Sequence, residues 1–309
     1  MQILGKQISN KLLSIENSFF QYRTNDYLFF PFFRISIGFF CAIHLLAILA
    51  DFDLLFTSDG LIPLEIFSVM KTQLIPSFGF ISKYFTNIGI SGDIVNNCYI
   101  AIYFICCLAL IIGFCTRTFA ICLLFLHIII FQSSTPYMYG VDFFKSISLF
   151  YCVVFPVGNL FSIDQRIFKR PLINPSPYRN LLKIHLCIVY FTSGLDKAFG
   201  INWWNGESIW KALHLPGFKS YLIGGYDIFI NYPFLPLFVG ISTVLLEMLY
   251  PIGINIVRIR PYWLAATIAM HAGIVIAMNL YFFGALMILL NLCAFAPLKN
   301  SENVQSTVH

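Results

Sequence analysis

One stretch of the sequence combines residue types that could carry out proton chemistry inside a hydrophobic protein. It begins at Tyr190, continues through Gly194 and Lys197, and reaches the paired tryptophans Trp203 and Trp204. Spacings of four and three residues place Tyr190, Gly194 and Lys197 on one face of a helix. An ammonium group in an apolar segment must be paired, hydrated or neutral, so an intramembrane lysine is a functional candidate. Lys197 is therefore the first candidate for a catalytic residue.

Each residue of this stretch also has a structural interpretation. Lys197 could extend to the lipid headgroups, or it could act as a neutral base because apolar surroundings disfavour the ammonium form. Trp203 and Trp204 could belong to the aromatic belt of the membrane interface, or they could form the wall of a site for a flat apolar ligand. In the second interpretation, Tyr190 and Gly194 would contribute to the same cofactor-binding site.

Two further ionisable side chains in apolar segments are candidates. Glu247 has no other charged residue within ten positions on either side, so it needs a partner or a proton. Pairing with Arg34 or with Lys197 as a structural charge remains as open as a catalytic role. His271 has Asn279 near the same helix face and is a candidate catalytic group, although a histidine bonded to a neighbouring helix is the more common case.

Other kinds of chemistry have no motif in this sequence. It contains no GxSxG, no phosphate-binding loop, no HExxH and no paired-carboxylate signature, which leaves hydrolase, nucleotide and zinc chemistry without support. The nine cysteines lie nearly all in apolar runs, without CxxC or Cys/His metal spacing. We expect them to be buried core residues and predict no metal site.

The composition indicates which elements must position these residues. Hydrophobic residues make up 59% of the 309 residues and charged residues 11%, whereas a soluble domain has about 25% charged residues. The mean hydropathy is +0.80. We therefore expect an all-α integral membrane protein in one domain. The net charge of +5 comes from basic residues in loops beside apolar segments, which indicates membrane topology rather than nucleic-acid binding.

The predicted architecture is a polytopic bundle of about eight transmembrane helices with interfacial and re-entrant helices. We predict an amphipathic interfacial helix at residues 1–27. The transmembrane domain is predicted at 28–298, and a polar tail follows at 299–309. In segment 51–97, short apolar stretches at 61–70 and 74–85 predict re-entrant or interfacial helices. The predicted spans are 28–50, 98–115, 118–133, 143–161, 181–200, 233–257 and two short helices within 263–297 that hinge near 279–284.

The distribution of basic residues predicts the orientation of this bundle. With eight spans, eleven lysines and arginines lie on the side of the N-terminus and four on the other side. The positive-inside rule then places the N-terminus in the cytoplasm and the Lys197 stretch near the outer face. The lack of a secretory or mitochondrial leader favours a bacterial inner membrane.

Four stretches of the chain resemble the HTTM (horizontally transferred transmembrane) domain, the membrane part of vitamin K-dependent gamma-glutamyl carboxylase. The most specific is Tyr190-Phe191-x-x-Gly194-x-x-Lys197 with Trp203 and Gly206. The resemblance covers about residues 25–298. Its other stretches are Phe33-Arg34-Ile35 with Gly38 and residues 58–63, then 113–117, and finally 139–142 followed by 155–164.

The resemblance implies an activity, a cofactor and two catalytic residues. Lys197 matches the base that deprotonates the vitamin K hydroquinone, and His271 falls in the helix that supplies a histidine in the carboxylases. The implied cofactor is a reduced naphthoquinone, and the implied activity is quinol-dependent carboxylation or epoxidation. The sequence departs from the carboxylases at two positions, which does not favour this activity. Asn159 occupies the position of a carboxylase histidine, and Asp196 occupies the position of a second lysine. The sequence also ends soon after the membrane domain, where the carboxylases continue into a large substrate-recognising domain.

Three classes of function follow from the sequence. The first is a quinol-dependent membrane enzyme with Lys197 as base. The second is a membrane factor for the export or maturation of a secreted peptide, similar to the sporulation-delaying protein B family and acting with neighbouring export proteins. The third is a non-catalytic membrane binding protein. In all three the lipid bilayer is a partner, a secreted peptide or protein is a candidate partner, and nucleic acid is not.

Overall fold

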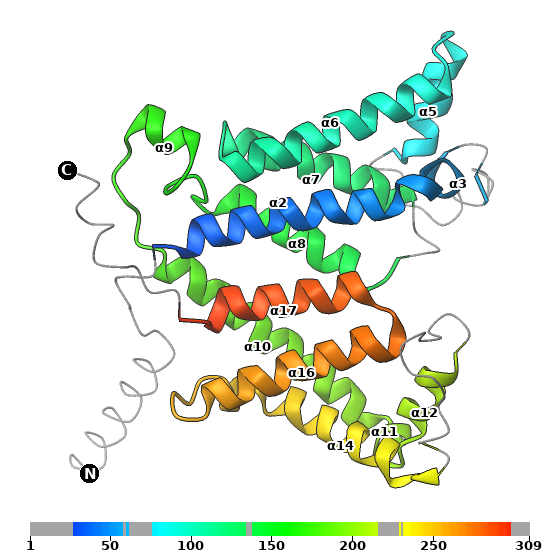
Figure 1. Ribbon diagram of the computed structural model, residues 1–309, viewed down its shortest axis with the longest axis vertical. Helices are drawn as coiled ribbons and strands as arrows, with labels where there is room; N and C mark the ends of the chain where they lie inside the picture. The colour runs from blue at the N-terminus through cyan, green and yellow to red at the C-terminus, as the bar shows by residue number, and fades with distance from the viewer. Residues whose placement is uncertain are drawn as a thin grey trace, which may run out of the picture. The chain divides into compact units, whose positions relative to one another are not determined.

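The computed structural model describes residues 27–57, 60–61, 76–133, 138–215, 229 and 231–297. In these ranges every regular element is a helix (Figure 1). Four predictions lie wholly or largely outside them: the interfacial helix at 1–27, the stretch 58–63, the short apolar helix at 61–70 and the polar tail at 299–309. Contacts divide the chain into two compact units. We call them the N-terminal unit, Tyr27–Ile173, and the C-terminal unit, whose described part begins at Asn174.

Four of the described helical segments are long and apolar enough to cross a membrane. An apolar helix of about 20 residues matches the thickness of the hydrocarbon core. These segments indicate an integral membrane protein and confirm the prediction of an all-helical chain. They are Phe29–Phe56, Gly92–Ile112 (α6), Thr116–Ser133 (α7) and Arg260–Met278 (α16). The first segment comprises α2 (Phe29–Ile48), a 3₁₀ turn (Leu49–Asp51) and α3 (Phe52–Phe56).

The N-terminal unit is built around α2, α6 and α7 with a shorter fourth helix. α6 packs against α2 and α7, and α7 packs against α8, Gly140–Val154. Two smaller helices, α5 (Phe78–Asn87) and α9 (Ile163–Phe168), complete the unit. α6 begins at Ser91, whose hydroxyl accepts the N–H of Ile94, and ends at Gly113 in the left-handed region with φ +73°. This glycine allows the sharp reversal into α7.

A polar contact ties three sequence-distant segments of the N-terminal unit together. Arg34 of α2 is fully buried, and its Nη2 donates to the carbonyl of Phe161 at 2.6 Å. Gly113 leaves the space that the guanidinium occupies, because a Cβ there would overlap Nη1. The backbone N–H of Asp164 donates to the carbonyl of Gly113 at 2.9 Å. The stretches around Arg34, Gly113 and Asp164, which are far apart in the sequence, therefore meet in space.

Asp164 also caps the first turn of α7. Its carboxylate accepts the N–H groups of Cys115 and Thr116, both at 2.7 Å, and the Thr116 hydroxyl at 2.6 Å. The first N–H groups of a helix lack intrahelical partners, and a negative charge there also interacts favourably with the helix dipole. Asp164 therefore fixes the turn at 113–115 that joins α6 to α7.

The C-terminal unit is organised by α10, Ser176–Phe199, which packs against α14, Phe234–Met248. α16 and α17 (Tyr281–Phe295) form a second antiparallel pair, orange and red in Figure 1. The predicted hinge between these two helices is confirmed, since Asn279 adopts the left-handed region with φ +56° at the break. The remaining helices are α11 (Ile201–Trp204), α12 (Glu207–His214) and α15 (Tyr250–Gly253).

Several predicted spans differ in length from the helices observed. The fourth span, expected at 143–161, ends at Val154 because Phe155, which precedes a proline, is extended with ψ 146°. The sixth, expected at 233–257, is interrupted after Met248, where Pro251 cannot donate a helical hydrogen bond. α8, α14 and α17 each have 15 residues, which corresponds to about 22 Å of helix against a hydrocarbon core of about 30 Å.

Candidate functional site

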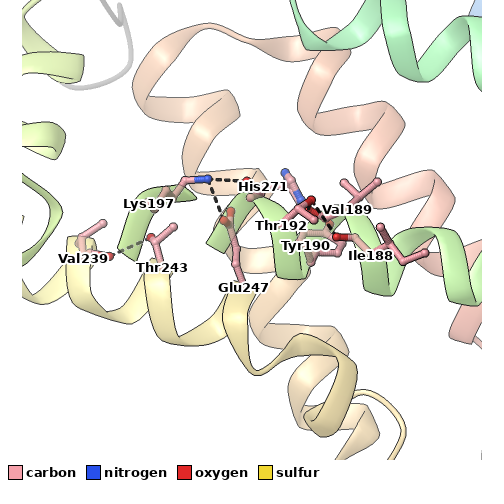
Figure 2. A network of polar contacts seen from close by, with 10 residues as sticks. Ile188, Val189, Tyr190, Thr192, Lys197, Val239, Thr243, Glu247 and His271 are labelled. Carbon is pink, nitrogen blue, oxygen red and sulfur yellow. Dashed lines mark hydrogen bonds and ion pairs between the residues drawn. The ribbon is translucent and has the colours of Figure 1, made fainter. Parts of the chain in front are cut away.

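Lys197 and Glu247 form an ion pair between α10 and α14 (Figure 2). Lys197 Nζ lies 2.7 Å from Glu247 Oε2 and donates a second hydrogen bond to Ser193 Oγ at 2.6 Å. The Glu247 side chain is 8% exposed and the Lys197 side chain 20% exposed. Of the two partners that the sequence leaves open for Glu247, the structure brings Lys197 to it. Arg34 lies in the other unit and hydrogen-bonds to Phe161.

Gly194 allows the two helices to approach closely enough for this pair to form. A Cβ at this position would lie 2.5 Å from the backbone nitrogen of Met248 and 2.9 Å from the carbonyl carbon and Cβ of Glu247. Real side chains do not tolerate such contacts with backbone atoms, so only glycine fits without moving α14. Gly194, which the sequence assigns to cofactor binding, therefore packs against α14 one turn before Lys197.

The segment that carries Trp203 and Trp204 also contacts the lysine. Lys197 Nζ lies 5.4 Å from the centroid of the Trp203 ring, within the range of a cation–π interaction. Two glycines hold this segment against α14: a Cβ at Gly206 would lie 2.6 Å from Leu237 N, and one at Gly240 would lie 2.6 Å from the carbonyl oxygen of Trp203. The ammonium group thus has a carboxylate, a hydroxyl and an aromatic face around it.

Trp204 has a different environment from its neighbour. Its indole N–H donates to the carbonyl of Ala198 at 2.8 Å, and the residue is 43% exposed. The hydrogen bond orients the ring against the end of α10, and the exposed part resembles the interfacial tryptophans of membrane proteins. Trp203 is therefore the tryptophan that contacts Lys197.

A second network of buried polar side chains begins one turn before Gly194 on the same helix. Tyr190 Oη lies 2.6 Å from His271 Nε2 and accepts a hydrogen bond from Asn291 Nδ2 at 2.7 Å. Asn291 Oδ1 in turn accepts the hydroxyl of Tyr250 at 2.6 Å, and the rings of Tyr190 and Tyr250 stack with centroids 4.1 Å apart. All four side chains are buried. The network joins α10, α15, α16 and α17.

The hydrogen-bond pattern of this network allows one arrangement in which every contact has a donor and an acceptor. Since Asn291 donates to the Tyr190 oxygen, the Tyr190 hydroxyl is free to donate to His271 Nε2. The proton of a neutral His271 then resides on Nδ1, and this nitrogen is buried without a hydrogen-bond partner among the described residues. His271 also lies within electrostatic range of Lys197. The predicted face of α10 thus contacts both groups of ionisable residues.

The sequence missed several polar residues of these networks. The predicted neighbour of His271 was Asn279, but Asn279 lies at the break between α16 and α17, and its Oδ1 accepts the Tyr281 hydroxyl at 3.0 Å. The group that contacts His271 is instead Tyr190, which accepts a hydrogen bond from Asn291. The signal that could have identified Asn291 is a lone amide in the apolar run from Met287 to Phe295, where an unpaired polar group is costly.

The cavities in the described part of the C-terminal unit include two that Lys197 does not line. One, of about 360 Å³, lies along α10 beside Lys183, Cys187 and Phe191. The other, of about 420 Å³, includes Gly206 and Trp210. In the part of the chain that the structure describes, no group of three or more His, Cys, Asp or Glu side chains is arranged to hold a metal ion.

The chemical capacity of the site is proton exchange between two groups that are largely shielded from solvent. An amine and a carboxylate in direct contact can pass a proton between them, and the aromatic ring above the amine offers a flat apolar surface.

Comparisons of the chain with protein families, with curated proteins and with solved structures found no match.

Proposed function

We propose that the protein is an integral membrane enzyme that uses the Lys197–Glu247 pair for proton transfer and a reduced naphthoquinone as cofactor. The observation that carries this proposal is the 2.7 Å contact between Lys197 Nζ and Glu247 Oε2, at a site where both side chains are largely shielded from solvent. Charged pairs in apolar surroundings lose much of their hydration, and an ionisable pair in a membrane protein is a functional candidate.

The pair places a proton acceptor, the Glu247 carboxylate, in direct contact with the Lys197 amine. The sequence left open whether Lys197 extends to the headgroups or acts as a neutral base; we propose that its proton passes to Glu247 during the reaction. When the proton resides on Glu247, Lys197 is a neutral amine that can accept a proton from a weak acid. Ser193 accepts a hydrogen bond from the amine at 2.6 Å and thereby orients it. Lys197 then receives the substrate proton, while Glu247 holds the proton that it took from the Lys197 ammonium group.

The residues around Lys197 suit a flat, weakly acidic diol. The Trp203 ring, whose centroid lies 5.4 Å from Lys197 Nζ, could pack against an aromatic ligand. His271 Nδ1 is a buried polar atom without a partner in the described ranges and could donate to a ligand oxygen. A bound hydroquinone would supply the electrons that reduce dioxygen, giving the quinone epoxide and water.

We further propose that eight helices of an HTTM-like domain, residues 28–298, span the membrane: α2, α6, α7, α8, α10, α14, α16 and α17. Contacts within the C-terminal unit support an alternating order. Arg179 at the start of α10 donates to the carbonyl of Cys293 at the end of α17, at 3.0 Å. Basic residues then gather at one end of this unit, which we assign to the cytoplasm together with the N-terminus. We take the membrane to be a bacterial inner membrane.

Epoxide formation tests this proposal. Membranes containing the wild-type protein would be supplied with a reduced naphthoquinone and oxygen, and the epoxide would be followed by chromatography with mass detection. We expect epoxide from the wild type, none from Lys197→Ala, and unchanged formation from Lys183→Ala, a lysine on the same helix that borders the cavity without Lys197. Absence of epoxide from the folded wild type with several naphthoquinols would contradict the enzyme proposal. It would leave the peptide-maturation and binding functions as the alternatives.

A further inference from the structure

The N-terminal unit contains a buried lysine that the proposed function does not use. Lys145 lies on α8, and its Nζ is 2.7 Å from Nδ1 of His44 on α2. Lys145 is 4% exposed and His44 8% exposed. Burial of an ammonium group among membrane helices is costly unless it is compensated, so its retention needs a physical reason.

The contact between these two bases limits the number of protons that they hold. A lysine amine and an imidazole that share a short hydrogen bond cannot both be fully protonated, because His44 Nδ1 or Lys145 Nζ must offer a lone pair to the other. The pair therefore carries at most one proton beyond its neutral form. That proton can reside on either nitrogen without breaking the hydrogen bond.

The groups that surround the pair provide one counter-charge. Cys41 on α2, Cys107 on α6 and Asp142 on α8 lie within electrostatic range of Lys145, and Tyr103 on α6 contacts Cys41. Asp142 is the carboxylate of this group, one helical turn before Lys145. A single negative charge at this position balances a single proton on the pair.

One more ionisable group faces the pair from α7. His127 is completely buried and lies within electrostatic range of Lys145 and His44. Its Nε2 is 3.2 Å from the backbone carbonyl of Asp142, and its Nδ1 has no hydrogen-bond partner among the described residues. Because a second positive charge here would have no counter-charge, His127 is expected to stay neutral while the pair holds the proton.

We propose that His44 and Lys145 form a proton-binding site buried among the helices of the N-terminal unit, which takes up and releases one proton with Asp142 as counter-charge. This site is separate in composition from the Lys197–Glu247 pair and goes beyond the proposed enzyme function. The opposing interpretation is a permanent ammonium group that fastens α8 to α2. The two differ in whether the charge of Lys145 changes with pH.

Nuclear magnetic resonance of the side-chain nitrogens distinguishes these interpretations. The full-length protein would be labelled with ¹⁵N at lysine and histidine side chains, placed in lipid bilayers and titrated from about pH 5 to about pH 10, which covers the ordinary pKa values of both groups. The Lys145 signal is identified by its coupling to an imidazole nitrogen, and confirmed by its loss in Lys145→Arg. We expect the Lys145 and His44 signals to change together at one midpoint.

A matched variant and an internal control complete the experiment. In His44→Gln the amide cannot take up a proton, so the Lys145 midpoint should shift by at least one pH unit, about a tenfold change in proton affinity. The Lys183 amine, which hydrogen-bonds to Asn180 at 3.4 Å, should be unaffected by this substitution. A Lys145 signal that stays protonated, or stays neutral, over the whole range in the wild type would overturn the proposal even if the variant failed to fold.

Discussion

Replacing Gly194 by alanine should separate α10 from α14 and disrupt the candidate site. The added Cβ would lie 2.5 Å from Met248 N, whereas ordinary contact begins at 3.4 Å, so the backbone must move by about 0.9 Å. The same movement would lengthen the 2.7 Å Lys197–Glu247 contact to about 3.6 Å, beyond hydrogen-bond distance. Overpacking of this size costs about 1–3 kcal/mol.

Thermal or denaturant unfolding in detergent measures this effect, with Gly273→Ala as the matched control. Gly273 lies in α16, and a Cβ there would meet nothing within 4 Å. Alanine is favoured over glycine in a helix by about 1 kcal/mol, so the control should be neutral or more stable. Equal stability of the two variants, with epoxide formation retained in Gly194→Ala, would refute the close-approach argument.

Three other predictions test separate parts of the structure. Asp164→Ala removes three hydrogen bonds at the start of α7 and should lower the free energy of unfolding by about 2 kcal/mol or more. Asp93→Ala, at an exposed position in the first turn of α6, removes only an interaction with the helix dipole and should lower it by less than about 1 kcal/mol. Tyr190→Phe leaves the buried His271 Nε2 without its partner and should cost about 1–3 kcal/mol in the same unfolding measurement. Asn291→Leu acts on the same network, so the destabilisation of the double variant should differ from the sum of the two single effects. The hydrogen bond and charge of Lys211 lower the pKa of the exposed Glu207 carboxyl, so Lys211→Ala should raise that pKa toward its usual value in a titration followed by magnetic resonance.

The face of α10 could be predicted because helical spacing is a local property. Tyr190, Gly194 and Lys197 lie on one face in the structure and contact neighbouring helices as expected. The partner of Lys197 could not be chosen from the sequence, because fifty positions separate it from Glu247 and no local pattern links them. Pairing across helices depends on packing, which the sequence does not state directly.

Isolated polar residues in apolar runs were the main omission. Lys145 follows two phenylalanines within a predicted span, yet it was not singled out, and the structure brings it to His44 from another helix. The ends of α8 and α14 were also misplaced, because an apolar composition continues past Pro156 and Pro251 while the helical hydrogen bonds do not. Hydropathy detects burial in the membrane more readily than it detects the end of a helix.

Chemical rescue of Lys197→Ala tests the role of Lys197 as a base most directly. Small primary amines such as ethylamine would be added to membranes that contain this variant, and epoxide formation from a reduced naphthoquinone would be measured. If the Lys197 amine accepts the substrate proton, activity should be absent without the added amine and should rise with its concentration, while Glu247→Gln should be slow and unaffected by amines. Full activity of Lys197→Ala without any added amine would contradict the assignment of Lys197 as the base.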